Sequence, residues 1–314
     1  MMEKIKVIFC GTPQIGADIL TTLTEMKNVE VVLVISQPDR PVGRKKELKP
    51  TPVKEIALKN NLKIIQPVKI SEAYEEIAQI ETDFIVTCAY GQFVPTKILD
   101  LPKIDSINVH GSLLPKYRGG APIQYAIKNG DSKTGISIMK MVKKMDAGDY
   151  YIQESINIEE TDDTGSMFEK LAKLGQKMIK ENLLKIYNNE LSPIAQNEDE
   201  VTFSKNISTE EEKINWNDLS VNVWNHIRSL SPWPIAHTFK GEERYKIQKV
   251  QILNNNVEAK PGTIVNISEN GIDVQTNDGQ VQILLIQKPG KKMMEASSYK
   301  LNNLSDLKVG DYFE

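Results

Sequence analysis

Residues 106–120 read SINVHGSLLPKYRGG, an apolar strand that runs directly into a turn rich in glycine and proline. Similar short apolar strands alternate with helical periodicity from residue 1 to about residue 190. That alternation is typical of an α/β fold with a doubly wound, mostly parallel, Rossmann-like sheet. We expect strands at 6–10, 29–35, 63–65, 84–89, 106–110 and 134–140, and helices at 14–26, 52–60, 71–80, 121–129 and 164–188.

The pattern changes after residue 190. Polar residues and Pro193 interrupt the periodicity, which predicts a linker at 191–205 between a first domain (1–190) and a second (206–314). The second domain has one helical segment at 221–230, followed by strand patterns. The turn signals Asn270-Gly271 and Asn277-Asp278-Gly279 separate some of these strands. Five or so short strands of this spacing predict a small closed β-barrel of the OB-like type.

The composition is that of an ordinary water-soluble protein. The 314 residues carry a net charge of −3, so the charge alone does not indicate nucleic-acid binding. Cys10 and Cys88 both lie in apolar runs and are expected to be reduced core thiols. With no secretory signal or membrane-spanning stretch in the sequence, we expect a cytoplasmic protein without a membrane partner, and by default a monomer.

Three polar residues suggest a catalytic site. In an open α/β sheet, ligands bind beyond the carboxyl ends of the strands, where His110 is expected. Asn108 precedes it by two residues and so projects from the same face, while Asp146 follows on the tight turn MDAGD. An amide donor to a developing oxyanion contributes roughly 3–4 kcal/mol, and imidazole moves protons near neutral pH. Asp146 would orient His110, hold a water or favour its protonated form.

Each of these residues also has a purely structural interpretation. A histidine can cap a strand end, an asparagine can satisfy loop backbone, and an aspartate before a glycine can form a turn. The occurrence of all three residues together favours a catalytic site for acyl transfer to an amine over these structural interpretations. The first turn, 11–16, has neither GxGxxG nor phosphate-loop spacing, so no nucleotide cofactor is expected. His226 and His237 are interpreted as structural, and no ligand spacing predicts a metal site.

Basic residues gather in two places. Residues 37–50 hold five basic side chains against two acidic ones in a segment too broken for a helix, which suggests a mobile loop that contacts phosphates. Lys288, Lys291 and Lys292 form a smaller cluster around a Pro-Gly turn. Arg118, within RGG, is expected either to hold an anionic group or to lie on an exposed turn.

Residues 108–115 (NVHGSLLP), 117–119 (YRG) and 146–149 (DAGD) resemble the signature of the formyltransferases. The loop at 37–50, the SPWP run at 231–234 and QKPGKKM at 287–293 resemble the methionyl-tRNA formyltransferase family more narrowly. The resemblance covers essentially the whole chain. It implies transfer of the formyl group of 10-formyltetrahydrofolate to the α-amino group of methionine on initiator tRNA, giving N-formylmethionyl-tRNA for translation initiation.

The resemblance also implies roles for individual residues. Asn108 would polarise the formyl oxygen, His110 would assist addition as a base or as an electrostatic stabiliser, and Asp146 would tune His110 and shuttle a proton. The folate-binding residues implied by the match are Ser112, Leu113, Leu114, Pro115, Tyr90 and Gly91. The residues expected to contact tRNA, in part at its acceptor stem, are Arg40, Arg44, Lys45, Lys46, Lys291 and Lys292, and the second domain would grip the tRNA backbone.

Three other functions remain open from the sequence. The acceptor could be an amino sugar or a ribonucleotide amine, although a small acceptor requires neither the basic loop nor a second domain. Water could replace the amine, which would make the protein a hydrolase that releases formate from the same folate. The chain could also be a non-catalytic RNA-binding protein, against which the intact Asn108, His110 and Asp146 argue.

Overall fold

The computed structural model describes residues 4–42, 47–255 and 257–314. The chain forms two compact units. The first comprises Met1–Pro122, Thr134–Ile156 and Phe168–Ser204, and the second comprises Ile123–Lys133, Asn157–Met167 and Lys205–Glu314. Two short segments from the middle of the sequence therefore pack with the second unit.

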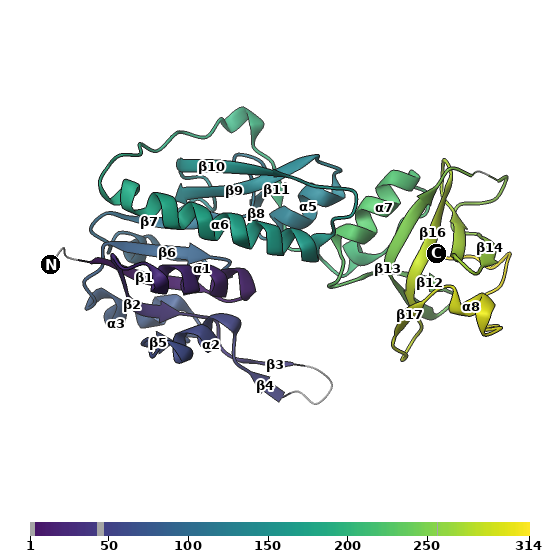
Figure 1. Ribbon diagram of the computed structural model, residues 1–314, viewed down its shortest axis with the longest axis horizontal. Coiled ribbons are helices and arrows are strands. Elements are labelled where there is room, and N and C mark those ends of the chain that lie inside the picture. Colours follow the sequence, from purple (N-terminus) through teal and green to yellow (C-terminus); the bar gives the residue numbers. More distant parts are fainter. Residues whose placement is uncertain (1–3, 43–46, 256) are drawn as a thin grey trace. The chain divides into compact units, whose positions relative to one another are not determined.

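A seven-stranded sheet forms the centre of the first unit (Figure 1). Its strands are β1 (Ile5–Gly11), β2 (Val29–Ile35), β5 (Ile64–Ile65), β6 (Phe84–Cys88), β7 (Asp105–His110), β9 (Lys133–Lys140) and β10 (Tyr150–Asn157). The order across the sheet is β10-β9-β7-β6-β1-β2-β5. The five strands from β7 to β5 pair in parallel, and β9 runs antiparallel to β7. The predicted doubly wound, mostly parallel sheet is therefore confirmed.

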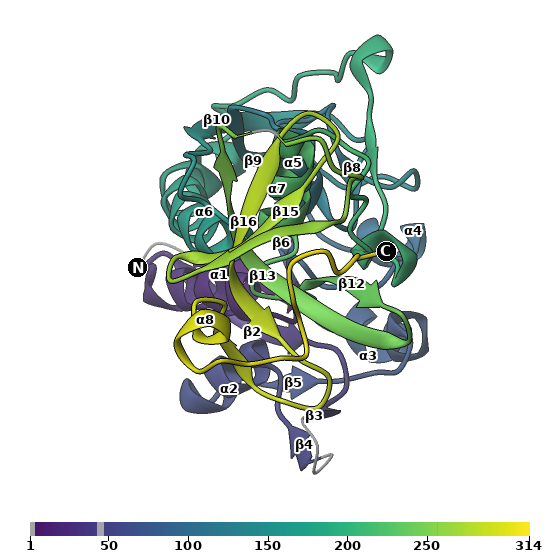
Figure 2. The same cartoon turned by 90° about the vertical axis from the view of Figure 1, so that its right-hand side faces the viewer.

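Helices cover both faces of this sheet. They are α1 (Gln14–Glu25), α2 (Pro52–Lys59), α3 (Tyr74–Ala78), α4 (Thr96–Leu99) and α6 (Thr164–Tyr187), whereas α5 (Pro122–Lys128) belongs almost entirely to the second unit. Figure 2 shows α1 and α6 on one side of the strands and α3 and α4 on the other. Gly175 in α6 allows a close approach to Ile19 in α1, and on the opposite face Ile77 and Ile98 pack against Ile8 of β1. The helix predicted at 71–80 is instead a 3₁₀ turn (Ile70–Ala73) followed by the short α3.

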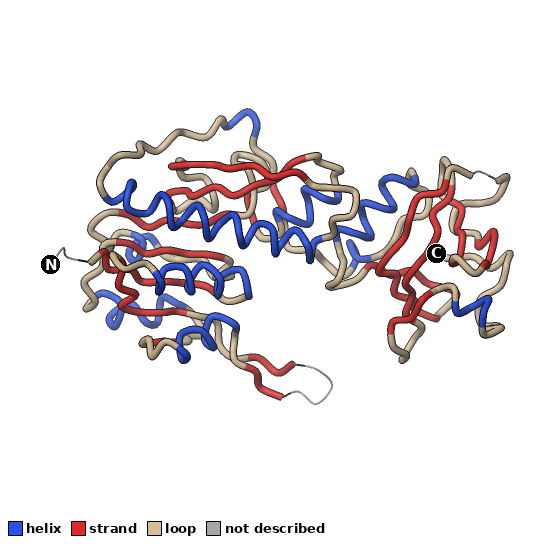
Figure 3. The backbone as a smooth tube through the Cα atoms, viewed as in Figure 1, coloured by secondary structure: helices blue, strands red, loops and turns tan. Residues whose placement is uncertain are grey.

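The basic loop at 37–50 contains regular structure in its described part. Strands β3 (Arg40–Val42) and β4 (Glu47–Lys49) form an antiparallel hairpin (Figure 3). A second small pair lies outside the main sheet, where β8 (Arg118–Gly119) runs parallel to β11 (Phe203–Ser204). Both pairs are too short to show a strand pattern in the sequence.

The second unit is built on an antiparallel sheet (Figure 2). Its strands are β12 (Ala236–Lys240), β13 (Glu243–Leu253), β14 (Ile264–Ser268), β15 (Gly271–Gln275), β16 (Gln280–Gln287) and β17 (Met293–Glu295). Helix α7 (Ser220–Ser229) contributes Val223 and Ile227 to its core, where Trp216 stacks on Phe313 with ring centroids 6.0 Å apart. Helix α8 spans Ser298–Leu301, and short 3₁₀ turns lie at Glu198–Glu200 and Glu210–Glu212.

The strand order of this sheet is β12-β13-β16-β15-β14, with β17 paired to β16. Over the described residues this order is an open path, because no ladder joins β14 back to β12. The predicted second domain of short β-strands is confirmed, and its sheet is antiparallel, but its closed, OB-like barrel form is not confirmed.

Two further sequence predictions can be compared with the structure. Cys10 and Cys88 are buried free thiols, as expected, and burial raises the pKa of each to about 12. Among the described helices, none is both long enough and apolar enough to cross a membrane.

Candidate active site

Asn108 and His110 lie at the carboxyl end of β7, on one face of the strand as their spacing predicts. His110 is 6% exposed, and Asn108 is half-buried. The Asn108 Oδ1 atom accepts a hydrogen bond of 2.8 Å from the Thr87 hydroxyl on the neighbouring strand β6. Because Thr87 occupies the acceptor end of this amide, the Nδ2 donor is the end left to meet a ligand.

The imidazole of His110 faces an oxygen atom on each side. Its Nε2 atom lies 3.1 Å from the Tyr117 carbonyl, to which it can donate. Its Nδ1 atom lies 3.9 Å from Oδ2 of Asp146, close enough for an electrostatic interaction but longer than a hydrogen bond. The structure thus brings the two predicted residues together, although 36 positions separate them in the sequence.

Asp146 lies on the connection between β9 and β10, with a left-handed backbone conformation of φ 50°. Its Oδ2 atom accepts a hydrogen bond of 2.8 Å from the Gly119 amide. Its carbonyl and that of Gly148 accept hydrogen bonds of 2.9 and 2.6 Å from the side chain of Gln196. A Cβ atom at Gly148 would lie 2.0 Å from the Lys140 carbonyl, so this position requires glycine. We call residues 146–148 the Asp146 turn.

Arg118 does not lie on an exposed turn, so that one of its two predicted alternatives was wrong. Its side chain is 1% exposed and donates to Oε1 of Gln196 from Nε at 3.0 Å and from Nη2 at 2.8 Å. The same Nη2 atom pairs with Glu198 at 2.7 Å. With these partners, the guanidinium joins two parts of the first unit.

The segment predicted to bind folate is held firmly in place. The buried Ser112 hydroxyl donates to the Lys116 carbonyl at 2.6 Å. The Ser137 hydroxyl accepts from the Leu114 amide at 3.2 Å, and Gln153 donates to the Leu114 carbonyl at 2.7 Å. Leu113 and Pro115 are half-buried and remain accessible from outside. Any folate contact of this segment is therefore made by those two side chains and by backbone groups.

Tyr90 and Gly91 follow β6, next to the end of β7. The Tyr90 ring is 4% exposed and belongs to the apolar cluster on the α3 and α4 face of the sheet. Burial also raises the pKa of its hydroxyl, which has no hydrogen-bond partner among the described residues. Gly91 is exposed, with φ 81°. The accessible part of this turn is thus its backbone at Gly91 and not the tyrosine ring.

The residues predicted to contact tRNA fall into three groups. Arg40 is exposed at the start of β3, while Arg44, Lys45 and Lys46 lie outside the described residues. Lys291 and Lys292 are both exposed in the second unit. Lys288, which the sequence groups with them, pairs with Asp306 at 2.6 Å and covers the Tyr299 ring at 4.7 Å. It therefore serves the packing of the second unit.

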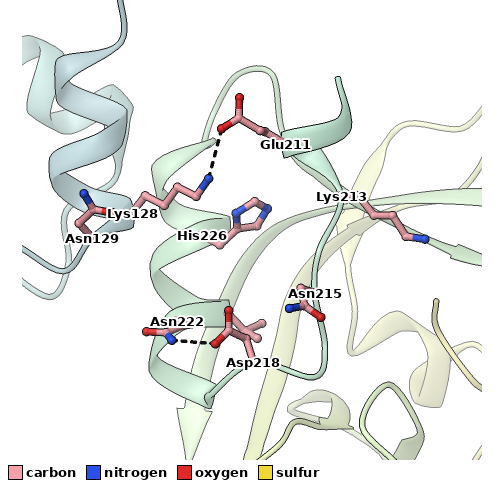
Figure 4. A pocket seen from close by; sticks show the side chains of 9 residues that line it. Lys128, Asn129, Glu211, Lys213, Asn215, Asp218, Asn222 and His226 are labelled. Atoms are coloured by element: carbon pink, nitrogen blue, oxygen red, sulfur yellow. Dashed lines mark hydrogen bonds and ion pairs between the residues drawn. The ribbon is translucent and has the colours of Figure 1, made fainter. Parts of the chain in front are cut away.

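The second unit contains a polar cavity of about 630 Å³ beside α7 (Figure 4). His226 lines it, as do Lys128 and Glu211, which pair at 3.5 Å. One ring nitrogen of His226 bonds to the Glu212 backbone, and its Nε2 atom has no partner in the described structure. Burial, aided by Lys128, lowers the pKa of His226 to about 4, so the ring is neutral at physiological pH.

No sequence pattern singles out Gln196, Thr202 or Ser204 as site residues. They lie in the polar segment predicted as a linker, more than 40 residues beyond Asp146. The structure nevertheless places all three in contact with backbone groups beside His110 and Asp146. Glutamine and serine in a polar segment are too common to be recognised as site residues without the tertiary contacts.

The sequence matches known families along most of its length. A family model described as formyl transferase matches residues 3–183, and one described as formyl transferase, C-terminal domain, matches residues 206–303. A methionyl-tRNA formyltransferase of Mesoplasma florum is 97% identical over 313 residues, covering 100% of both chains. Those of Mycoplasma mycoides and Lactococcus lactis are 62% and 47% identical, over 100% and 99% of each chain.

Solved structures share the fold at much lower identity. A sugar 3N-formyltransferase, WlaRD, has a TM-score of 0.69 at 22% identity and covers 92% of this chain and 100% of its own. HypX from Aquifex aeolicus has a TM-score of 0.67 at 15% identity and covers 98% of this chain but 49% of its own. The structures establish the fold, and the full-length sequence matches establish the family. The chain belongs to the methionyl-tRNA formyltransferase family.

Proposed function

We propose that this chain transfers the formyl group of 10-formyltetrahydrofolate to the α-amino group of methionine on initiator tRNA, with Asn108, His110 and Asp146 at the reacting atoms. The observation that supports this most is the convergence of an amide donor, an imidazole and a carboxylate at one edge of the sheet. His110 and Asp146 approach within 3.9 Å, and Asn108 projects beside His110 from the end of β7.

Asn108 stabilises the oxygen of the formyl group. When the amine nitrogen bonds to the formyl carbon, that oxygen gains negative charge, and the Asn108 Nδ2 group donates a hydrogen bond to it. Thr87 holds Oδ1 of Asn108 and so fixes the orientation of the amide before the reaction. A donor that is already oriented costs no reorganisation when the charge appears.

His110 and Asp146 transfer the proton that the reaction moves from the amine to the folate. The attacking amine must lose a proton, and the departing N10 atom of the folate must gain one. His110 assists the addition while the Tyr117 carbonyl holds its ring, and Asp146 carries the proton between the two nitrogens. The bound folate supplies an activated formyl group. After the methionine nitrogen has bonded to the formyl carbon, the carbon–nitrogen bond to N10 breaks, and N10 leaves with the proton that it gains.

The substrates are held by groups outside this set. Leu113, Pro115 and the backbone of residues 112–115 contact the folate, together with the exposed turn at Gly91. The exposed Arg40 and the neighbouring basic residues 44–46 bind phosphates near the tRNA acceptor stem, and Lys291 and Lys292 contribute from the second unit. Residues 1–190 form the catalytic domain and 206–314 the tRNA-binding domain of a cytoplasmic monomer. Residues 191–205 join the two domains, and most of this segment packs with the first unit.

The test is formyl transfer from 10-formyltetrahydrofolate to methionine-charged initiator tRNA, beside uncharged tRNA and free methionine. The expected result is N-formylmethionyl-tRNA from the charged tRNA alone. Formate release without transfer would replace this proposal by the hydrolase. Transfer to an amino sugar or a ribonucleotide amine, but not to the charged tRNA, would assign a different acceptor.

A further inference from the structure

Residues 196–204, here called the strap, run along the side of the site that bears Asp146 and Tyr117. They lie in the segment that the sequence predicts as a linker, and they belong to the first compact unit. The strap makes side-chain hydrogen bonds to the Asp146 turn, and both side-chain and backbone hydrogen bonds to the 117–120 loop. Those two segments carry the immediate partners of His110.

Gln196 contacts the Asp146 turn at two points. Its Nε2 group donates to the Asp146 carbonyl at 2.9 Å and to the Gly148 carbonyl at 2.6 Å. Two bonds from one amide fix both ends of this three-residue turn. Since the backbone of Asp146 is in the left-handed region, which costs a non-glycine residue about 1–2 kcal/mol, external bonds help to hold it there.

Arg118 holds Gln196 from the other side. Its Nε and Nη2 groups both donate to the Gln196 Oε1 atom, which leaves the Nε2 end of this amide directed at the turn. Glu198, 61% exposed, accepts from the same guanidinium and from Lys144, which lies two residues before Asp146. Because Arg118 is 1% exposed, its contact with Gln196 is sheltered from water.

The far end of the strap reaches the partner of His110. The Ser204 hydroxyl donates to the Tyr117 carbonyl at 3.1 Å, the same oxygen atom that lies 3.1 Å from the His110 Nε2 atom. Thr202 accepts from the Tyr117 amide at 2.9 Å. At Gly119 a Cβ atom would lie 2.2 Å from the Ser204 carbonyl, so the strap and the loop touch without room for a side chain.

We propose that Gln196 is a positioning residue for Asp146, and that the strap as a whole fixes the distance between the carboxylate of Asp146 and the ring of His110. This inference rests on the catalytic role proposed above for Asp146. Gln196 touches no reacting atom and acts only through the turn. Because misplacement of a catalytic group by about 1 Å costs on the order of 10²-fold in rate, a loosened turn lowers kcat while substrate binding is unchanged.

The test compares the same substitution at two glutamines of the full-length chain. Gln196→Met removes both donations to the turn at nearly constant size. Gln176→Met is the matched control, since Gln176 in α6 also donates to a backbone carbonyl, that of Asp18 at 3.1 Å, away from the site. We expect Gln196→Met to lower kcat by about 10- to 100-fold with unchanged KM for folate and tRNA. The control should keep its kcat, and equal losses in both variants would overturn the inference.

A second arm separates positioning from folding. In the Asp146→Asn background, Gln196→Met should change kcat by less than about twofold, because effects of residues that act as one unit do not add. An undiminished further loss would mean that Gln196 serves the fold and would overturn the inference. Gln196→Glu keeps the acceptor for Arg118 but removes the donor to the turn. If this variant is folded and has the kcat of the wild type, the inference is overturned.

The activities of Asp146→Asn and Gln196→Met together distinguish a failure of this inference from a failure of the proposed function. Full activity of Asp146→Asn would remove Asp146 from the mechanism, and the proposed catalytic assignment would fail together with the positioning role. A strong loss in Asp146→Asn combined with full activity in Gln196→Met would leave the assignment intact and overturn only the role of Gln196.

Discussion

Two turns of the first unit have proposed roles in different tasks, and they are built differently. The Asp146 turn is bonded through its carboxylate by Gly119 and through its backbone by Gln196. The basic loop is anchored at Asp39, whose pKa is held below its usual range by hydrogen bonds from Gln66 and Lys54. The next residue, Arg40, is exposed.

The difference follows from what each task requires. Formyl transfer depends on donors held within a fraction of an ångström, which hydrogen bonds and close packing provide. Attraction to the phosphates of a large substrate needs charge near the surface, and a long exposed side chain supplies it without exact placement. Hydrogen bonds therefore fix the Asp146 turn, whereas the exposed side chain of Arg40 can adjust its conformation to the substrate.

The largest expected effect is at the fixed site. His110→Ala should lower kcat by about 10²- to 10⁴-fold, the usual contribution of a positioned proton-transfer group. Folate affinity should change little, because the two oxygen atoms that the ring faces belong to Asp146 and Tyr117, and neither residue is among those proposed to bind folate. Steady-state kinetics and a folate titration measure both quantities. Full activity of this variant would contradict the catalytic assignment.

The second largest effect is expected where Gly119 packs closely against the strap. Gly119→Ala would place a Cβ atom 2.2 Å from the Ser204 carbonyl at φ +124°, and should reduce the free energy of unfolding by about 2–4 kcal/mol. Gly241 is the control, because it also has positive φ (+58°) but no atom within 4 Å of the added Cβ. Denaturant unfolding measures both variants. A similar decrease in the free energy of unfolding of both variants would mean that backbone strain, and not contact with the strap, causes the destabilisation.

The second unit also contains a group that is fixed by burial and by a hydrogen bond, the side chain of His237. His237, 4% exposed on β12, accepts a hydrogen bond from Arg244 through Nδ1 at 2.9 Å. Burial, aided by Arg244, lowers its pKa from 6.5 to about 4. Between these values the unfolded chain binds a proton that the folded chain does not, so stability is complete above pH 6.5 and falls as the pH drops towards 4.

Since one pKa unit corresponds to about 1.4 kcal/mol, this histidine should remove on the order of 2–3 kcal/mol from the free energy of unfolding across that window. His237→Gln keeps an acceptor for Arg244 and cannot titrate. Denaturant unfolding at pH 7 and pH 4.5 should therefore show a smaller pH dependence in the variant. An identical pH dependence would show that His237 does not titrate in this range.

The smallest expected effect is at the exposed charge. Arg40→Ala should raise the KM for tRNA but not for folate, and should lower the slope of log binding constant against log salt concentration by about 1. Lys59→Ala, at an exposed lysine on α2, is the control. Equal changes in both KM values would instead mean that the loop shapes the folate pocket.

Much of the first unit could be predicted because its signals are local. Strand β2 was predicted with its observed ends because its residues are nearly all apolar, and the period of α6 separates its buried residues from its exposed ones. Strand β10 was missed because its residues are mostly half-buried, with no apolar alternation. The predicted helix at 71–80 broke into two shorter segments, and the three-residue strands of the basic loop left no periodic pattern.

The sequence by itself determined the α/β class, the strand-rich character of the second domain and the candidate trio of Asn108, His110 and Asp146. Each of these rests on residue type and short-range spacing, which a single chain displays directly. Only the tertiary structure decided that Arg118 is buried, that the Tyr90 ring packs into the core and that residues 196–204 hold the site together. Those facts depend on hydrogen bonds and packing between residues far apart in the chain, which no local pattern encodes.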